Sequence, residues 1–259
     1  MSLPLNLNQF ATMVAIIAKL RAPDGCPWDR KQTHASLRKN LLEECYEVLE
    51  ALDEGNSGRL CDELGDLLMQ VVLHTQIATE AGEFEVGDVI SSINAKLVHR
   101  HPHIFGSLKV KDADEVAHNW EVLKREERAT DASMLEGVPK QMPALAYSQQ
   151  IQQRVAQVGF DWEDINGVID KLAEEVSEFK QADSQEQKEM EFGDLLFTLV
   201  NIARRLGIDL EVALRQANKR FYHRFSYMEK VCHQRGLNLG DLSFAQQNTL
   251  WEEAKKKVE

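Results

Sequence analysis

Apolar residues recur along this chain at the three- and four-residue spacing of amphipathic helices. In the segment 57–81, for example, Leu60, Leu64 and Val71 belong to one apolar stripe. No stretch shows the sustained period-two alternation with β-branched residues that a half-buried strand requires. The pattern predicts an all-α protein, with helices at 8–21, 33–54, 57–81, 86–100, 112–129, 144–157, 165–182, 185–206, 209–235 and 243–258.

Residues that favour helix ends lie between these segments. All six prolines fall outside the predicted helices, where a helix is expected to stop. Asn8, Thr33 and Ser57 are expected to be N-caps, and Gly82 and Gly207 are expected to end the helices before them.

The segment 130–143 is the best candidate for a linker, because it carries two prolines and a glycine and has weak periodicity. We therefore expect an N-terminal domain at 1–130, a linker at 131–143 and a C-terminal domain at 144–259.

One carboxylate pattern occurs twice, once on each side of this linker. Each copy has two adjacent glutamates, a third glutamate three residues later, and then a Glu-x-x-Asp pair that runs into two leucines. The acids are Glu43, Glu44, Glu47, Glu63 and Asp66 in the first copy, and Glu174, Glu175, Glu178, Glu191 and Asp194 in the second. A tryptophan precedes each copy, and residues 93–100 align with 217–224. We interpret this repetition as a tandem duplication of one helical domain.

Each copy is expected to gather its acids at one groove. Residues three or four apart share a helix face, and short connections near 53–57 and 183–184 make each helix pair an antiparallel αα-hairpin. Four or five converging carboxylates repel one another unless a cation lies among them. Mg²⁺ is the expected metal because it takes oxygen ligands, and Mn²⁺ is the alternative.

Other interpretations of the polar residues fit less well. A single Glu-x-x-Glu is usually a solvated helix face, but here the whole pattern recurs and Glu63 and Asp66 border the apolar stripe. A di-iron centre uses Glu-x-x-His, and neither copy has histidine at that place. The histidines at 99, 101 and 103 lack the acid spacing of a zinc site, and Pro102 ends their helix. The P-loop and Gly-x-Ser-x-Gly motifs are absent.

Cationic residues are distributed unequally between the copies. Lys171 lies one turn before the second acidic cluster, whereas Asn40 takes its place in the first copy, and Ala95 takes the place of Lys219. This asymmetry favours the second copy as a triphosphate site, although each cation is also compatible with an ordinary solvated helix face and Trp251 with a core position. The substrate-binding candidates are Lys171, Lys188, Lys219, Arg220, Arg224, Trp251 and Lys255.

Composition narrows the class of protein. The 259 residues are 43% hydrophobic, enough for one large domain or two ordinary ones. The net charge of -12 argues against nucleic-acid polymers and anionic membranes as partners. The first ten residues lack the features of a signal peptide, no apolar run is long enough to span a bilayer, and the four cysteines show no CxxC pair. We expect a soluble cytoplasmic protein.

Several motifs together resemble the MazG-type nucleoside triphosphate pyrophosphohydrolases, over essentially the full length and in the two-domain form. They are Cys-Pro-Trp-Asp at 26–29, Arg-His-Pro-His-Ile-Phe-Gly at 100–106, Val-Gly-Phe-Asp-Trp at 158–162, and the two acidic patterns with Gly-Asp-Leu-Leu at 65–68 and 193–196. The resemblance implies an all-α fold, Mg²⁺ dependence, and hydrolysis of nucleoside triphosphates to monophosphate and pyrophosphate. It also implies a homodimer in which each hairpin completes a four-helix bundle with the partner's helices, and catalysis by the second copy.

We therefore expect Glu175, Glu178, Glu191 and Asp194 to bind Mg²⁺ and, with Glu174, to form the catalytic set. The first copy is either a second active site or a scaffold that has kept its acids. Two alternative functions are a non-catalytic nucleotide-binding module and a narrow-specificity pyrophosphatase for dUTP or phosphoribosyl-ATP.

Overall fold

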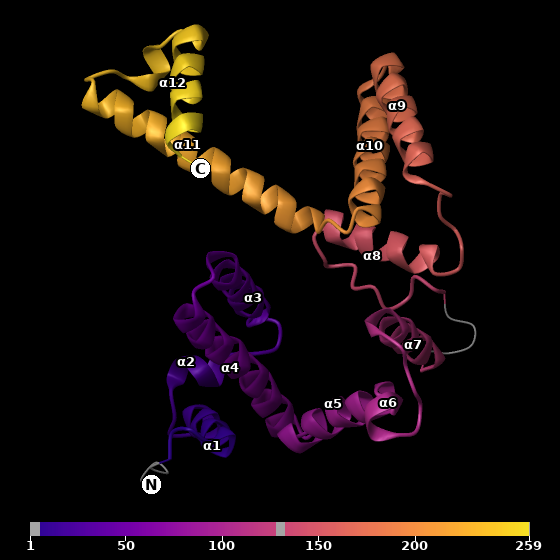
Figure 1. The fold of residues 1–259 in the computed structure, drawn as a ribbon. Coiled ribbons are helices and arrows are strands. Elements are labelled where there is room, and N and C mark those ends of the chain that lie inside the picture. The colour runs from indigo at the N-terminus through magenta and orange to yellow at the C-terminus, as the bar shows by residue number, and fades with distance from the viewer. Residues whose placement is uncertain (1–5, 128–132, 259) are drawn as a thin grey trace. The chain divides into compact units, whose positions relative to one another are not determined.

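The computed structural model describes residues 6–127 and 133–258, and over these ranges all regular structure is helical. The predicted all-α class is confirmed. The chain forms two compact units, residues 1–127 and 128–259. The first unit contains α1 (Phe10–Arg21), α2 (Pro27–Lys31), α3 (Arg38–Glu54), α4 (Ser57–Ala81), α5 (Val86–Arg100), α6 (Pro102–Phe105) and α7 (Ala113–Glu126) (Figure 1). The second contains α8 (Ala144–Ala156), α9 (Ile165–Gln181), α10 (Gln185–Arg205), α11 (Leu210–Gln234), the short 3-10 helix η1 (Leu239–Asp241) and α12 (Phe244–Lys257).

Parts of two predictions lie outside the described residues: the end of the helix expected at 112–129, and residues 131–132 of the linker expected at 131–143. The other long helices begin and end within a few residues of their predicted bounds, except that α3 begins five residues late, at Arg38.

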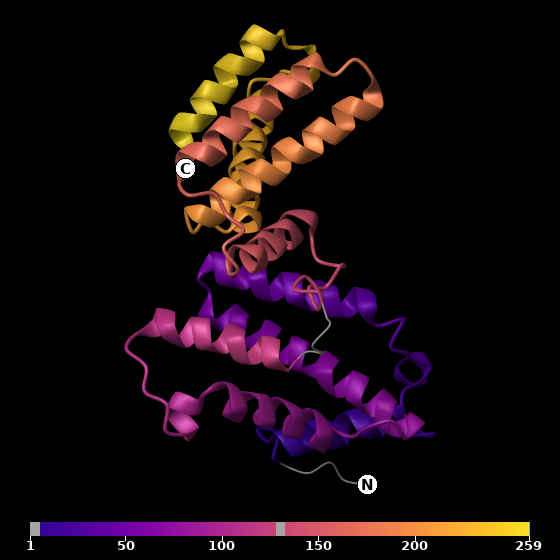
Figure 2. The same cartoon turned by 90° about the vertical axis from the view of Figure 1, so that its right-hand side faces the viewer.

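The acids of each unit lie on an antiparallel helix pair, α3–α4 and α9–α10, and Figures 1 and 2 show α9 and α10 side by side. Gly55 ends α3 with a left-handed backbone (φ 65°), and the side chain of Asn56 caps the start of α4. In the second unit, Asp164 caps α9, and Ser184 begins α10 in a capping box. The connection between α3 and α4 is thus capped at both ends, and the connection between α9 and α10 runs only from Ala182 to Ser184. Both are short, as the sequence predicted.

Three of the predicted helix signals are placed differently in the structure. Thr33 is not the N-cap of α3, because Thr33 and Ser36 hydrogen-bond to each other's backbone N–H in a separate turn, and α3 starts only after Leu37. The N-cap of α1 is Gln9 and that of α4 is Asn56, in each case one residue from the predicted cap. The 3-10 helix η1 and two short α-helices, α2 and α6, were missed. Both α2 and α6 begin with a proline at the first position, where the missing N–H costs nothing.

The first unit has its core between α1, α4 and the turn before α3. Ile17, Leu37, Val72 and Leu73 are buried together, and Met69 packs against them. Leu37 is only 1% exposed although it lies outside regular structure. This small core fixes the end of α4 that is distant from its acids.

The second unit buries residues in two regions. Val168 on α9 and Val200 on α10 have no exposed surface. A second cluster joins α11 to α12 and contains Met228, Val231, Cys232, Leu250 and Ala254. Helix α11, about 37 Å long from its residue count, contacts α8 near its start and α12 near its end. Its distal half and α12 therefore form an arm that stands apart from α9 and α10 (Figure 1).

Both hairpins leave large apolar side chains exposed. On α4 these include Leu64 and Val71, and on α10 they include Phe192, Leu196 and Leu199. These side chains are not covered by the described residues of their own unit. None of the described helices is nevertheless long and apolar enough to cross a membrane.

Two stacked histidines join the turn before α3 to α4. The rings of His34 and His74 are nearly parallel, with centroids 5.1 Å apart, and their Nδ1 atoms lie 2.8 Å from each other. Nε2 of His74 is buried without a hydrogen-bond partner. Burial lowers the pKa of His74, and the nearby charge of His34 lowers it further. The pair is therefore compatible with at most one proton on the two Nδ1 atoms.

This pair predicts that the first unit loses stability as the pH falls below about 6.5, the ordinary value for histidine. The folded-state pKa of His74 is below the unfolded one, so the unfolded chain takes up the proton first. The stabilisation is complete above pH 6.5 and is lost as the pH falls through the folded-state pKa. Thermal unfolding between pH 7.5 and 5.5 measures the loss. His74→Phe should weaken this dependence, whereas His233→Phe, at an exposed position, should retain it.

Candidate active site

The second hairpin brings three glutamates together across two helices. One carboxylate oxygen from each of Glu175 and Glu178 on α9 and Glu191 on α10 lies within 4.8 Å of the other two. Asp194 is close enough to Glu191 for its charge to raise the pKa of Glu191. Three of the acids in the predicted pattern, Glu175, Glu178 and Glu191, therefore converge, and Asp194 lies near Glu191.

Glu174 has a different environment from the other acids of this copy. Its side chain is 57% exposed and accepts a hydrogen bond from Lys171 at 2.7 Å. It is not among the three acids whose oxygens converge. Glu174 therefore lies beside the cluster and helps to orient Lys171 through this hydrogen bond.

Glu175 is the most deeply placed acid of the cluster. Its side chain is 5% exposed, and its Oε1 lies 2.9 Å from Nζ of Lys171. Its Oε2 is buried and has no hydrogen-bond partner. Such an oxygen lowers the stability of the fold, because a buried acceptor loses its hydrogen bonds to water and gains none from the protein. A cation or a bound water among these oxygens would remove that cost, so the donor set fits a hard divalent metal.

The mutual repulsion of these acids affects the pKa of Glu191. Burial raises the pKa of Glu191, the charges of Glu178, Asp194 and Glu175 raise it further, and Lys171 opposes them. The hydrogen bonds to Glu174 and Glu175 in turn raise the pKa of Lys171, so this lysine is held in its charged form. One internal cation thus offsets part of the negative charge of the cluster.

The first hairpin has a corresponding cluster of Glu44, Glu63 and Asp66, with one oxygen from each within 4.8 Å of the others. Burial raises the pKa of Glu47, and the charges of Glu63, Glu44 and Glu43 add to the effect. Glu47 therefore borders this cluster, and Glu43 is exposed. Two positions are shared by the clusters, Glu44 with Glu175 and Glu63 with Glu191, whereas the third acid is Asp66 in the first copy and Glu178 in the second.

Protein groups satisfy the first cluster more fully than the second. Nε of Arg59 lies 3.2 Å from Glu63, and the same guanidinium reaches Glu50 and Glu54 at 2.6 and 2.9 Å. Buried Gln70 donates to Oε1 of Glu44 at 3.3 Å. Thr198 takes the place of Gln70 in the second copy, seven residues after the Glu-x-x-Asp glutamate in each case. The roles of Arg59 and Gln70 were missed in the sequence, although Arg59 precedes Glu63 by four residues, an ion-pairing interval on a helix.

The predicted substrate-binding cations fall into two groups. Lys171 and Lys188 belong to the hairpin, with Lys188 exposed in the first turn of α10. The second group lies on α11 and α12, which extend away from the acids of α9 and α10 in the same unit (Figure 1). In this group Lys219 and Arg220 are exposed, Arg224 lies over the ring of Trp251 at 5.9 Å, and Lys255 pairs with Glu252.

The histidine-rich segment after α5 makes packing contacts and hydrogen bonds within the first unit. His101 packs edge-on against Trp120 with ring centroids 4.7 Å apart, and its Nδ1 hydrogen-bonds to the backbone oxygen of Leu97. The neighbouring Arg100 pairs with Glu127. These contacts attach α6 and α7 to the end of α5.

Comparison with known proteins identifies the family of this chain. The model of the MazG nucleotide pyrophosphohydrolase domain matches residues 32–105, which contain the first hairpin and its acids. A "nucleoside triphosphate pyrophosphohydrolase/pyrophosphatase MazG" of Thermotoga maritima is 46% identical over 95% of both chains. The chain belongs to the MazG family. The resemblance seen in the sequence is thereby confirmed.

Two further relatives show the extent of the MazG similarity. The "nucleoside triphosphate pyrophosphohydrolase" of Escherichia coli K12 is 42% identical over 97% of this chain and 98% of its own. The "uncharacterized protein YabN" of Bacillus subtilis is 46% identical over 96% of this chain but only 52% of its own length. Both alignments include the second hairpin as well as the first, because they span nearly the whole chain.

Proposed function

We propose that this MazG-family chain hydrolyses nucleoside triphosphates to nucleoside monophosphates and pyrophosphate, in nucleotide-pool house-cleaning, with the second unit as the main catalytic unit. The observation that carries the proposal is the convergence of Glu175, Glu178 and Glu191 around a buried carboxylate oxygen that no protein group satisfies. The names of the relatives from Thermotoga maritima and Escherichia coli support the reaction class.

The acids of the second hairpin would hold Mg²⁺, through Glu175, Glu178, Glu191 and Asp194, with Mn²⁺ as a substitute. A bound Mg²⁺ supplies a Lewis acid that polarises phosphoryl oxygens and neutralises developing charge. Lys171 fixes Glu175 through its hydrogen bond. A carboxylate of the cluster that is not otherwise engaged can accept the proton of a water attacking the α-phosphorus, as a general base.

The triphosphate carries several negative charges, and the second hairpin alone has few cationic side chains to neutralise them. Lys171 and Lys188 lie on it, and the remaining candidates lie on the separate arm. We propose a homodimer, because it would cover the exposed apolar faces of the hairpins and can bring cations of one copy toward the acids of another. Sedimentation velocity tests this directly, and a monomer at working concentration would contradict it.

The assay that tests the function is product analysis with a panel of ribo- and deoxyribonucleoside triphosphates in Mg²⁺, including dUTP and phosphoribosyl-ATP. We expect monophosphate and pyrophosphate in equal amounts, with no orthophosphate, because attack at the α-phosphorus breaks the α–β bond. Release from dUTP or phosphoribosyl-ATP alone would identify a narrow-specificity enzyme. Nucleotide binding without any pyrophosphate would contradict the enzyme proposal and favour the non-catalytic module.

A further inference from the structure

Arg59 links the two helices of the first hairpin beside the acidic cluster. Its guanidinium contacts three carboxylates. Two of them, Glu50 and Glu54, lie on α3 at 2.6 and 2.9 Å, and the third, Glu63, lies one turn further along α4 at 3.2 Å. Glu63 is also one of the three acids that converge in the first cluster. Arg59 therefore neutralises a carboxylate that a metal ion at this cluster would also use.

The contact between Arg59 and Glu63 can break without leaving the guanidinium unpaired. Only Nε of Arg59 faces Glu63, whereas its two terminal nitrogens donate to Glu54 and Glu50. A guanidinium has five N–H groups, and most of them lie on these terminal nitrogens. If Glu63 turns to another cation, Arg59 keeps both carboxylates of α3. The hairpin thus has an arrangement for Arg59 with Glu63 engaged and one with Glu63 released.

The second copy places its internal cation differently. Four residues before Glu191, where the first copy has Arg59, α10 has Gln187, which takes part in the capping box of that helix. The cation of the second cluster is Lys171, and it bonds to acids of its own helix α9. Within the part of the chain that the structure describes, Glu191 has no ion pair. The Glu-x-x-Asp glutamate is therefore paired with a cation only in the first copy.

The first cluster nevertheless contains a polar atom that the protein leaves unsatisfied. Gln70, 3% exposed, donates through Nε2 to Oε1 of Glu44 at 3.3 Å. A carboxylate can only accept, so the NH₂ group of Gln70 faces the cluster, and its own Oε1 is buried without a hydrogen-bond partner. Mg²⁺ usually retains several waters, and such waters donate hydrogen bonds. The acids and this amide together fit a hydrated divalent cation.

We propose that Arg59 competes with a divalent cation for the first acidic cluster, so that the first unit takes up Mg²⁺ only at a higher concentration than the second. Two like charges about 10 Å apart, at an effective dielectric constant of about 20, repel enough to lower an affinity by more than about 10-fold. Binding of a cation through Glu63 therefore favours the arrangement in which Arg59 keeps only its α3 partners. This inference rests on the proposed function in one respect, that Mg²⁺ is the metal of the acidic pattern.

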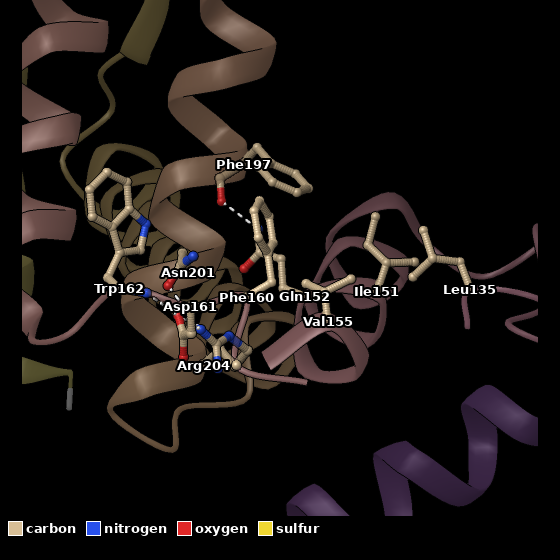
Figure 3. A pocket seen from close by; sticks show the side chains of 11 residues that line it. Leu135, Ile151, Gln152, Val155, Phe160, Asp161, Trp162, Phe197, Asn201 and Arg204 are labelled. Carbon is tan, nitrogen blue, oxygen red and sulfur yellow. Dashed lines mark hydrogen bonds and ion pairs between the residues drawn. The ribbon is translucent and has the colours of Figure 1, made fainter. Parts of the chain in front are cut away.

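The fold of the first unit does not depend on Arg59. Further along α4, Leu73 is buried in the core and Met69 packs against it. In the second unit the corresponding positions hold Asn201 and Phe197, which line a cavity of about 590 Å³ between α8, α10 and the loop before α9 (Figure 3). Helix α4 is thus held by apolar packing beyond its acids. A substitution at the partly exposed Arg59 should leave the first unit folded.

The test measures Mn²⁺ binding to the full chain by calorimetric titration, without nucleotide. Every protein carries Glu191→Gln, which weakens binding at the second cluster so that the first cluster can be measured. On this background, Arg59→Gln introduces the residue type that the second copy has at this position. Arg30→Gln is the matched control, with the same change of charge at an exposed position of α2. Arg21 joins α2 to the far end of α4.

Arg59→Gln should tighten Mn²⁺ binding at least about 10-fold. Arg30→Gln should leave the affinity unchanged, because solvent and salt screen a charge so far from the acids. The added affinity should disappear when Glu44→Gln is combined with Arg59→Gln, which locates it at the first cluster. Unchanged affinity in Arg59→Gln, an equal gain in Arg30→Gln, or a gain that survives Glu44→Gln would overturn the inference.

Thermal unfolding separates competition from mere support of the fold. Without metal, Arg59→Gln should lower the unfolding temperature, because the converging acids lose a counter-charge. Added Mn²⁺ should then raise this temperature more than it does in the protein that keeps Arg59. A purely structural role would lower the unfolding temperature equally with and without Mn²⁺, and that result would also overturn the inference.

Failure of the proposed function is distinguishable from failure of this inference. It appears as a wild-type protein that releases no pyrophosphate from any nucleotide, or whose Mn²⁺ binding is unaffected by Glu191→Gln. Neither result decides the comparison of Arg59→Gln with Arg30→Gln, which requires no turnover and concerns the first cluster alone.

Discussion

We expect Glu175→Gln to lower the rate of pyrophosphate release at least about 100-fold. Removing a residue that only supports a metal ligand already costs up to about 100-fold, and removing a direct ligand should cost at least as much. The change keeps the size of the side chain but removes the charge that pairs with Lys171 at 2.9 Å. It also replaces the buried, unpartnered Oε2 with an amide group that does not bind a hard cation. Steady-state pyrophosphate release measures the loss, and circular dichroism verifies the fold.

Glu44→Gln is the matched control, because Glu44 has the same position in the first copy. Gln70 donates to Glu44, and Arg59 pairs with Glu63, so protein groups already satisfy much of that cluster. We expect the Glu44 variant to retain activity near the wild-type level. A comparable loss in both variants would show two working sites, and a loss only in Glu44→Gln would place catalysis in the first unit.

We expect that removal of divalent cations will abolish pyrophosphate release and that Mg²⁺ will restore it. The reason is electrostatic. The charges of Glu178, Asp194 and Glu175 raise the pKa of Glu191, and among the main influences on this pKa only the charge of Lys171 lowers it. Mn²⁺ is expected to replace Mg²⁺, since both accept carboxylate oxygens. Full activity after exhaustive chelation would contradict a metal-dependent site.

The same metal should stabilise the fold. A ligand that binds only the folded state at 100 times its dissociation constant adds about 2.7 kcal/mol to the free energy of unfolding. Thermal unfolding with and without Mg²⁺ measures this effect independently of turnover. The shift should be largely lost in Glu191→Gln and kept in Glu186→Gln, which changes an exposed glutamate in the first turn of the same helix. Equal shifts in both variants would place the bound metal elsewhere.

Helix positions were largely predictable from the sequence, because the helical period is a local property of the chain. The apolar spacing located α4 and α5 at the bounds that the structure gives. Start signals were less reliable. Thr33 has a good capping side chain, but it closes its own turn with Ser36, and the burial of Leu37 in the first core accompanies the later start of α3. Tertiary packing outweighed the local preference there.

The sequence by itself determined the all-α class, the duplication, and the helix faces that carry the acids. These depend on residue spacing within single helices. Only the tertiary structure decided that Glu175, Glu178 and Glu191 meet while Glu174 stays exposed, and that the cations of α11 and α12 lie on a separate arm. It also decided that Leu73 fills a core where Asn201 borders a cavity. The physical reason is that spacing fixes the direction of a side chain from its own helix, whereas contacts between helices depend on how residues distant in sequence pack.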